Sequence, residues 1–267
     1  MMRNLVVVGN VSQDTISYQG VCKGSSWGGA GLNISVSAAQ LSERPRLISI
    51  VGDDALDLLS QLEKKVDISL IKISRGKTCR FDIQYLSDGT LQNIGCDFGV
   101  ATGLNLHFQT IELPLAHYHV SCRQPLSPEQ VLPRIVKSNL PFSLDFILSS
   151  ARQQIVQSEG WIRLAKYVFV NSQELEILEG LYNIGDIQTL IITSGSQPVK
   201  VLRFGYEILS QSCDNKVFYD VTGAGDVFIG SFLGSQIGGD ELHVSIDKAM
   251  FMAQQSLDSI GVIRFLG

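Results

Sequence analysis

The sequence of 267 residues is long enough for one large α/β domain or two small ones, and 45% of its residues are hydrophobic while 18% are charged. This composition predicts a sizeable core and excludes a disordered chain. The formal net charge of −5, without blocks of lysine or arginine, argues against nucleic acid or an anionic membrane as a partner.

The first hundred residues alternate apolar runs with helical spacing. Residues 5–8 are an apolar run that ends at glycine, which is typical of a strand buried on both faces. Residues 46–51 are predicted to form another buried strand, which also ends at glycine. Helices are predicted at 33–41 and 55–64. The succession of strand, glycine turn, helix and strand predicts a parallel sheet flanked by helices.

Residues 78–100 have a different pattern. Apolar and polar residues alternate from Phe81 to Tyr85, and a Ser-Asp-Gly-Thr turn follows at 87–90. This pattern predicts a hairpin with one solvated face that projects from the main sheet. A long loop at 12–27 is expected to contribute to the same projection, so the two segments together are predicted to form a small β lid.

The second half returns to strands followed by helices. Strands are expected at 118–120, 143–146, 167–170, 189–193 and 199–204, and helices at 127–137, 173–178, 226–236 and 246–259. No internal repeat or linker interrupts the chain. Residues 1–267 are therefore predicted to form a single domain.

Cysteine usage and the first residues indicate a compartment. The five cysteines are widely spaced and form no Cys-x-x-Cys pair, which predicts free thiols in a reducing environment. The apolar run at 5–8 is too short for the core of a signal peptide, and no stretch is long enough to span a membrane. We expect a soluble, cytoplasmic protein.

The most informative motif is a glycine turn directly before an apolar stretch that predicts a buried helix. Gly223, Ala224 and Gly225 let the backbone approach a ligand, and the first turn of a helix offers unpaired N–H groups that can stabilise a transferring phosphoryl group. Asp226 follows and is positioned to accept the proton of an attacking hydroxyl. The alternative is an ordinary helix N-terminus, in which Asp226 only interacts favourably with the positive end of the helix dipole. No Gly-Lys-Ser/Thr follows, so this is not a Walker loop.

A second glycine turn and an early aspartate are candidates for the substrate site. Gly29 belongs to a Gly-Gly-Ala-Gly turn, and Asn33 after it offers a donor and an acceptor that suit sugar hydroxyls. Asp14 lies just past the first strand, where open α/β sheets bind ligands. The alternatives are an ordinary βα turn and a solvated loop aspartate. Ile34 stands where a dinucleotide-binding turn needs glycine or alanine, which argues against NAD.

Two later strand ends are candidates for nucleotide and metal binding. Asn171 and Glu174 place an amide and a carboxylate at one helix start, which suits Mg²⁺ held partly through water. An ordinary helix cap explains them equally well. Thr193 and Gly195 end the next strand, where a hydroxyl and a glycine backbone can contact triphosphate oxygens. A plain turn is the alternative there.

These motifs occur in an order that resembles the ribokinase/PfkB family of carbohydrate and nucleoside kinases. The segment 220–226 is similar to the family's C-terminal signature, whose last aspartate is the catalytic base. The double-glycine turn is similar to its N-terminal signature. Ser231 departs from the pattern, which usually has alanine or glycine there.

The resemblance implies a ribokinase-like three-layer sandwich with a mostly parallel central sheet and a small β lid. It implies ATP and Mg²⁺ as cofactors, with a monovalent cation near Asp220. In the family, an aspartate at the place of Asp14 holds substrate hydroxyls, an Asn-x-x-Glu element orders the magnesium and phosphate region, and a Thr-x-Gly element contacts the nucleotide.

We therefore expect an ATP-dependent kinase that phosphorylates a hydroxyl of a sugar or similar polyol. Ala30 stands where family members that act on phosphorylated sugars often carry lysine, which favours an unphosphorylated acceptor. A nucleoside kinase and a non-catalytic ligand-binding relative stay open as alternatives. Exposed edges of the lid make a homodimer a candidate assembly. His117 and His119 share a strand face, but no further ligand has metal-site spacing.

Overall fold

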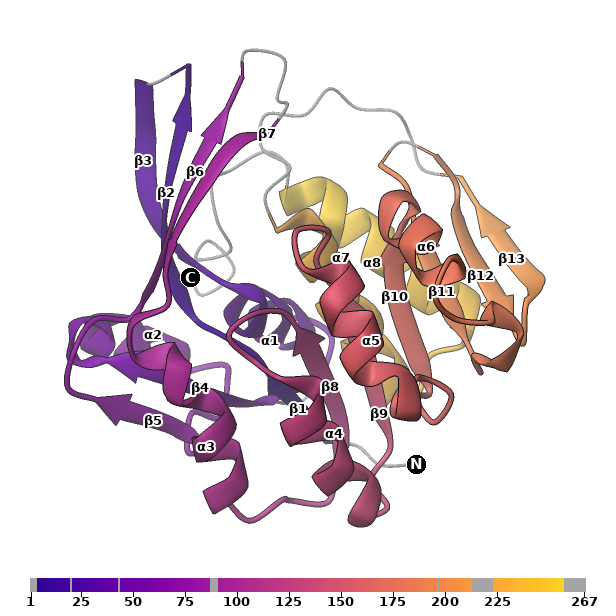
Figure 1. Cartoon of the computed structure of the whole chain (residues 1–267), viewed down its shortest axis with the longest axis horizontal. Coiled ribbons are helices and arrows are strands. Elements are labelled where there is room, and N and C mark those ends of the chain that lie inside the picture. Colours follow the sequence, from indigo (N-terminus) through magenta and orange to yellow (C-terminus); the bar gives the residue numbers. More distant parts are fainter. Residues whose placement is uncertain are drawn as a thin grey trace.

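The central element of the fold is a large β-sheet. The computed structural model describes residues 4–19, 21–42, 44–86, 91–195, 197–212 and 223–256. Nine strands form this sheet in the order β13-β12-β11-β10-β9-β8-β1-β4-β5 (Figure 1). Their bounds are β1 Leu5–Val8, β4 Arg46–Gly52, β5 Ile71–Ser74, β8 His117–Cys122, β9 Phe142–Phe146, β10 Tyr167–Asn171, β11 Leu190–Thr193, β12 Val199–Arg203 and β13 Tyr206–Gln211. Neighbours pair in parallel from β11 to β5, while β12 and β13 are antiparallel.

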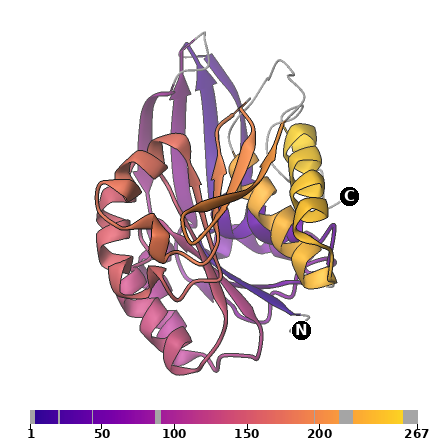
Figure 2. The same cartoon turned by 90° about the vertical axis from the view of Figure 1, so that its right-hand side faces the viewer.

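Helices cover both faces of this sheet. One face carries α1 Ala30–Ala38, α2 Leu56–Leu62, α7 Ala224–Gly238 and α8 Leu242–Ser256. The other carries α3 Leu104–Thr110, α4 Pro128–Lys137, α5 Ala151–Ile162 and α6 Ser172–Glu179. Figure 2 shows the sheet between the two helix layers.

The alternation of side chains along each strand explains the two cores. In β1, Leu5 and Val7 belong to the core under α1 and α7, whereas Val6 and Val8 belong to the core under α3 and α4. A strand between two helix layers is buried on both faces, which favours apolar residues on both, and β1 is apolar at all four positions.

A second sheet projects from one end of the first. It has four strands in the order β3-β2-β6-β7, with bounds β2 Ser12–Tyr18, β3 Val21–Gly28, β6 Cys79–Tyr85 and β7 Leu91–Asp97 (Figure 1). The predicted loop at 12–27 is wrong: it forms the hairpin β2–β3. Its glycines and serines hid the strand pattern, and β2 is held by parallel pairing with the distant β6, a contact that local sequence does not reveal.

The strand order creates a switch point at the boundary of β1 and β8. After β1, the next strands of this sheet in sequence, β4 and β5, are added on one side of it. The strands from β8 to β13 are then added in sequence order on the opposite side. Ligands of open α/β sheets bind outside the carboxyl ends of strands at such a point. Over the described ranges, no helix combines the length and apolar character needed to cross a bilayer.

Candidate functional site

The site is built around the first turn of α7. Gly223 caps this helix with φ of 81°, in the left-handed region that favours glycine. A Cβ there would lie 2.8 Å from the Nδ2 atom of Asn33, so the position has no room for a side chain. Asp226 is in the first turn and is only 5% exposed. The helix therefore presents its free N–H groups and this carboxylate at one place.

Two side chains from other elements hold the carboxylate of Asp226. The Nδ2 atom of Asn33, on α1, donates to Oδ2 at 3.0 Å. The Nη2 atom of Arg123, directly after β8, lies 2.6 Å from Oδ1. Asn33 Oδ1 is buried and has no hydrogen-bond partner among the described residues. That oxygen is available to a hydroxyl of a ligand.

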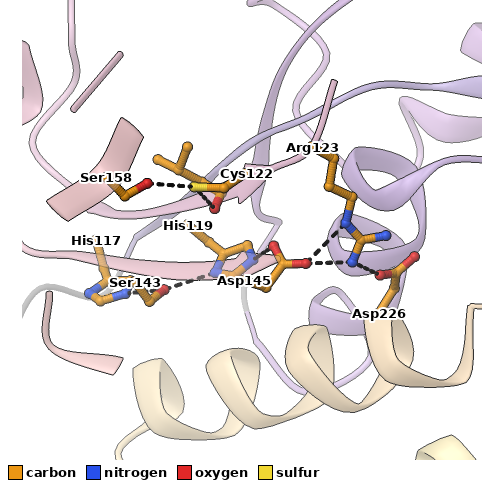
Figure 3. A network of polar contacts seen from close by, with 9 residues as sticks. His117, His119, Cys122, Arg123, Ser143, Asp145, Ser158 and Asp226 are labelled. Atoms are coloured by element: carbon orange, nitrogen blue, oxygen red, sulfur yellow. Dashed lines mark hydrogen bonds and ion pairs between the residues drawn. The ribbon is translucent and has the colours of Figure 1, made fainter. Parts of the chain in front are cut away.

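Behind Arg123 lies a row of buried polar side chains (Figure 3). Both Nε, at 3.1 Å, and Nη2 of Arg123 donate to Oδ2 of Asp145, and the other oxygen of Asp145 is 3.1 Å from Nε2 of His119. Ser143 Oγ lies 2.9 Å from Nδ1 of His119 and 3.0 Å from Nε2 of His117. The two histidines thus serve this row, and within the described residues no group of three His, Cys, Asp or Glu side chains forms a metal site.

Charge pairing sets the ionisation of this row. Burial raises the pKa of Asp145, but the charge of Arg123 and the hydrogen bond from His119 outweigh it and lower that pKa to about 2. Burial also opposes the charge of Arg123, yet the carboxylates of Asp145 and Asp226 raise its pKa. Burial, together with the nearby charge of Lys166, lowers the pKa of His117 to about 3, so this ring is neutral.

Two cavities meet at Asp226. One, of about 410 Å³, lies under the small sheet; its lining includes the predicted substrate residues Asp14, Gly29, Asn33 and Asp226. The other, of about 530 Å³, lies over the carboxyl ends of β10 and β11; its lining includes the predicted residues Asn171, Glu174, Thr193, Gly195, Gly223, Ala224, Gly225 and Asp226. Arg123, Gly223 and Asp226 line both cavities. The sequence motifs therefore converge on two adjoining chambers.

The first cavity has a polar floor and an apolar wall. On the floor, Asp14 accepts a hydrogen bond of 2.6 Å from Ser12 Oγ, and Gly29 has a φ of 90° that favours glycine. On the wall, four apolar side chains face the cavity from the small sheet and the segment after it: Phe81, Ile83, Ile94 and Phe98. The rings of Phe81 and Phe98 meet edge to face with centroids 6.4 Å apart.

In the second cavity, Asn171 and Glu174 form the helix cap that was the alternative to metal binding. Asn171 Oδ1 accepts from the backbone N–H of Glu174, and Glu174 Oε2 accepts from that of Asn171, both at 2.9 Å. Burial raises the pKa of Glu174 to about 7, despite the opposing hydrogen bond from Asn171 and charge of Arg123. A bound cation would favour the ionised form of this carboxyl.

Sequence reasoning missed Arg123 and Asp145. The signal for Asp145 was available, because a charged residue within the apolar strand β9 requires a buried partner. Arg123 immediately follows the strand at the switch point, which is also a position where ligand contacts are expected. Asp220, predicted to lie near a monovalent cation, is outside the described residues.

Comparison with known proteins gives matches over nearly the whole chain. A family model described as pfkB family carbohydrate kinase matches residues 2–266. A cytidine kinase of Thermococcus kodakarensis is 24% identical over 280 residues, which cover 97% of this chain and 98% of that protein.

Two solved structures share the fold. The nucleoside kinase of Burkholderia thailandensis in complex with inosine has a TM-score of 0.81 at 17% identity, covering 96% of this chain and 92% of that one. The ribokinase of Cryptococcus neoformans var. grubii serotype A in complex with ADP has a TM-score of 0.78 at 20% identity, covering 98% and 96%.

Proposed function

Because the chain belongs to the pfkB family of carbohydrate kinases, we propose that it transfers the γ-phosphoryl group of ATP to a hydroxyl of a sugar or similar small polyol. The observation that carries this proposal is the position of Asp226, whose carboxylate borders both cavities beside the free N–H groups of α7. A hydroxyl bound in one cavity and a triphosphate bound in the other would meet at this carboxylate.

In this proposal Asp226 accepts the proton of the acceptor hydroxyl as its oxygen bonds to phosphorus. The backbone N–H groups that follow Gly223, with the positive end of the α7 dipole, stabilise the charge on the transferring group. Arg123 lines both cavities, so its guanidinium is within the same region as the transferring group. The acceptor is held by Asp14 and by the free oxygen of Asn33.

The nucleotide occupies the larger cavity, with Thr193 and Gly195 beside its phosphates. The buried carboxyl of Glu174 suits a cation, since its ionisation is costly there without one. Glu174, with Asn171, would hold Mg²⁺ through water, and the ion would neutralise charge on the β- and γ-phosphates. The small sheet closes over the acceptor and excludes water, which protects ATP from hydrolysis.

A nucleoside is the second candidate acceptor, and the apolar wall of the first cavity favours it. Phe81 and Phe98 offer aromatic surface on which a base can pack, and Gln124 and Gln153 at the rim supply amides that can bond to its edge. A sugar alone leaves that wall unused. The similarity to a cytidine kinase supports the same choice. A panel of sugars, polyols and nucleosides, scored by ADP formation, separates the two.

Replacement of the base tests the reaction itself. Asp226→Asn keeps the size of the side chain and should lower kcat by about 100- to 10,000-fold, the range for general-base catalysis. ATP affinity, measured by calorimetry, should stay within about threefold. The exposed Asp57, substituted in the same way, is the control and should retain full activity. Wild-type turnover in the Asp226→Asn variant would refute the assignment.

A further inference from the structure

The row of buried polar side chains behind Arg123 has a geometry that suits more than packing. From the geometry we infer that Asp145, held by His119 and Ser143, is a positioning group that fixes the guanidinium of Arg123 between the two cavities. This inference rests on the proposed phosphoryl transfer and adds three residues to it. Asp145 borders the second cavity, whereas His119 and Ser143 line neither cavity. Figure 3 shows the row running from His117 to Asp226.

The sheet register brings the row together. Side chains alternate along a strand, so His117 and His119 of β8 face the same side as Ser143 and Asp145 of β9. In the parallel pairing of these strands, His119 is opposite Ser143 and Ser121 is opposite Asp145. All four side chains are buried, on the face that α7 covers. These four polar side chains therefore form a continuous row within the apolar core, which ends at the carboxyl end of β9.

The hydrogen bonds of the row have one consistent direction. The carboxylate of Asp145 only accepts, so Nε2 of His119 must donate to it. In the tautomer that donates through Nε2, Nδ1 of His119 accepts the hydroxyl proton of Ser143, whose oxygen in turn accepts from Nε2 of His117. Ser143 thereby sets the tautomer of His119, and His119 fixes one oxygen of Asp145. The other oxygen is left for Arg123.

Asp145 restricts Arg123 more than a single hydrogen bond would. Nε and Nη2 both donate to the same oxygen, and Nη2 also reaches Asp226. These contacts leave little freedom of rotation. The Nη1 atom makes no hydrogen bond to the described part of the chain, and the side chain lines both cavities. The free edge of the guanidinium is therefore available to an anionic ligand.

A contribution to folding stability does not explain why these buried polar side chains are present. Buried ion pairs repay their desolvation cost only with excellent geometry, and well-packed apolar side chains of similar size serve as well or better. The positioning role supplies the missing reason, because a guanidinium close to a transferring phosphoryl group is useful only if it is held in place.

A double-mutant cycle tests whether Asp145 acts through Arg123. Asp145→Asn should lower kcat about 10- to 100-fold, as loss of a side chain that orients a ligating group typically does, with the acceptor KM within about threefold. In an Arg123→Ala background the same substitution should change kcat by less than about twofold. An equal loss of kcat in both backgrounds, or no loss in the wild-type background, overturns the inference.

Histidine variants separate positioning from folding. His119→Gln keeps an amide near the place of Nε2 and should retain kcat within about threefold, whereas His119→Leu should lose about tenfold. Ser158→Ala is a matched control, because Ser158 is buried nearby and bonds to Gln154 and Cys122 outside the row. It should leave kcat unchanged. Equal loss in the Gln and Leu variants would contradict the inference.

A readout without turnover keeps the inference distinct from the proposed reaction. In ¹⁵N NMR spectra, the Nε–H group of Arg123, assigned with Arg123→Lys, should give a slowly exchanging signal in the wild type and in His119→Gln. The signal should be lost in His119→Leu. If the wild type forms no ADP with any acceptor, the proposed function fails while this result still upholds the positioning role. A signal that persists in His119→Leu overturns that role.

Discussion

Gly223→Ala is the substitution whose effect on stability follows most directly from the structure. The residue has φ of 81°, and an L-residue in this left-handed region costs roughly 1–2 kcal/mol. The added Cβ would also lie 2.8 Å from Asn33 Nδ2. Asn33 must then move, and its hydrogen bond to the Asp226 carboxylate, worth roughly 1.5–3 kcal/mol, is weakened or lost. We expect unfolding free energy to fall by about 2 kcal/mol or more.

Gly225→Ala is the matched control, two residues away. It lies inside the first turn of α7, where a Cβ would meet nothing within 4 Å. Alanine is preferred over glycine within helices by about 1 kcal/mol, so this variant should be slightly more stable than the wild type. Urea unfolding followed by circular dichroism measures both variants. The reasoning is refuted if Gly223→Ala is as stable as Gly225→Ala.

Two further substitutions test the energetics of other buried groups. The pKa of Glu174 is raised to about 7, above the unfolded value near 4.5. In the free protein, ionisation of Glu174 therefore lowers the unfolding free energy of the wild type as pH rises from about 4.5 to about 7. Glu174→Gln, which cannot ionise, should be more stable than the wild type by roughly 3 kcal/mol at pH 8 and by much less at pH 5, as measured by thermal unfolding at the two pH values. The hydroxyl of Thr78 accepts from the backbone N–H of Gly52 at 2.9 Å and donates to Asp54 at 2.6 Å. Thr78→Val removes both hydrogen bonds and should lower the unfolding free energy in urea by roughly 1–3 kcal/mol. Ser60→Ala, on the exposed face of α2, is the control and should lower it by less than about 0.5 kcal/mol. A flat pH response of Glu174→Gln, or equal stability of the two hydroxyl variants, would contradict these estimates.

Much of the architecture could be predicted because its elements carry their own signals. The first strand, β1, is a continuous apolar run, and α7 is buried around its whole circumference, with every residue from Asp226 to Ser235 buried. The predicted ribokinase-like sandwich and the resemblance to the family are confirmed. The residues named for the site also lie around two adjoining cavities, while their roles stay predictions.

The missed elements lacked such local signals. The buried face of α5 includes Gln154 and Ser158, which interrupt the apolar stripe that would have marked a helix. The hairpin β2–β3 depends on pairing with β6, more than 60 residues further along the chain. The same limit applies to the site. Arg123 and Asp145 are separated by 22 residues, and only the sheet register shows that they meet.

The glycines of the chain act in two different ways, and the site depends on both. Gly223 and Gly29 adopt left-handed backbone conformations at the cavities, whereas Gly230 and Gly234 lie inside α7 against α1. A Cβ at Gly234 would be 2.7 Å from the carbonyl oxygen of Ala38, and one at Gly230 would collide with that of Ile34.

Small residues at these two positions therefore let the backbones of α1 and α7 approach closely. This close approach explains how Asn33, at the start of α1, reaches Asp226 across 193 residues of sequence. If larger residues separated the two helices, the amide could no longer hold the carboxylate, even with both signature motifs intact. The spacing of two buried helices thus contributes to the geometry of the site as directly as the residues that line it.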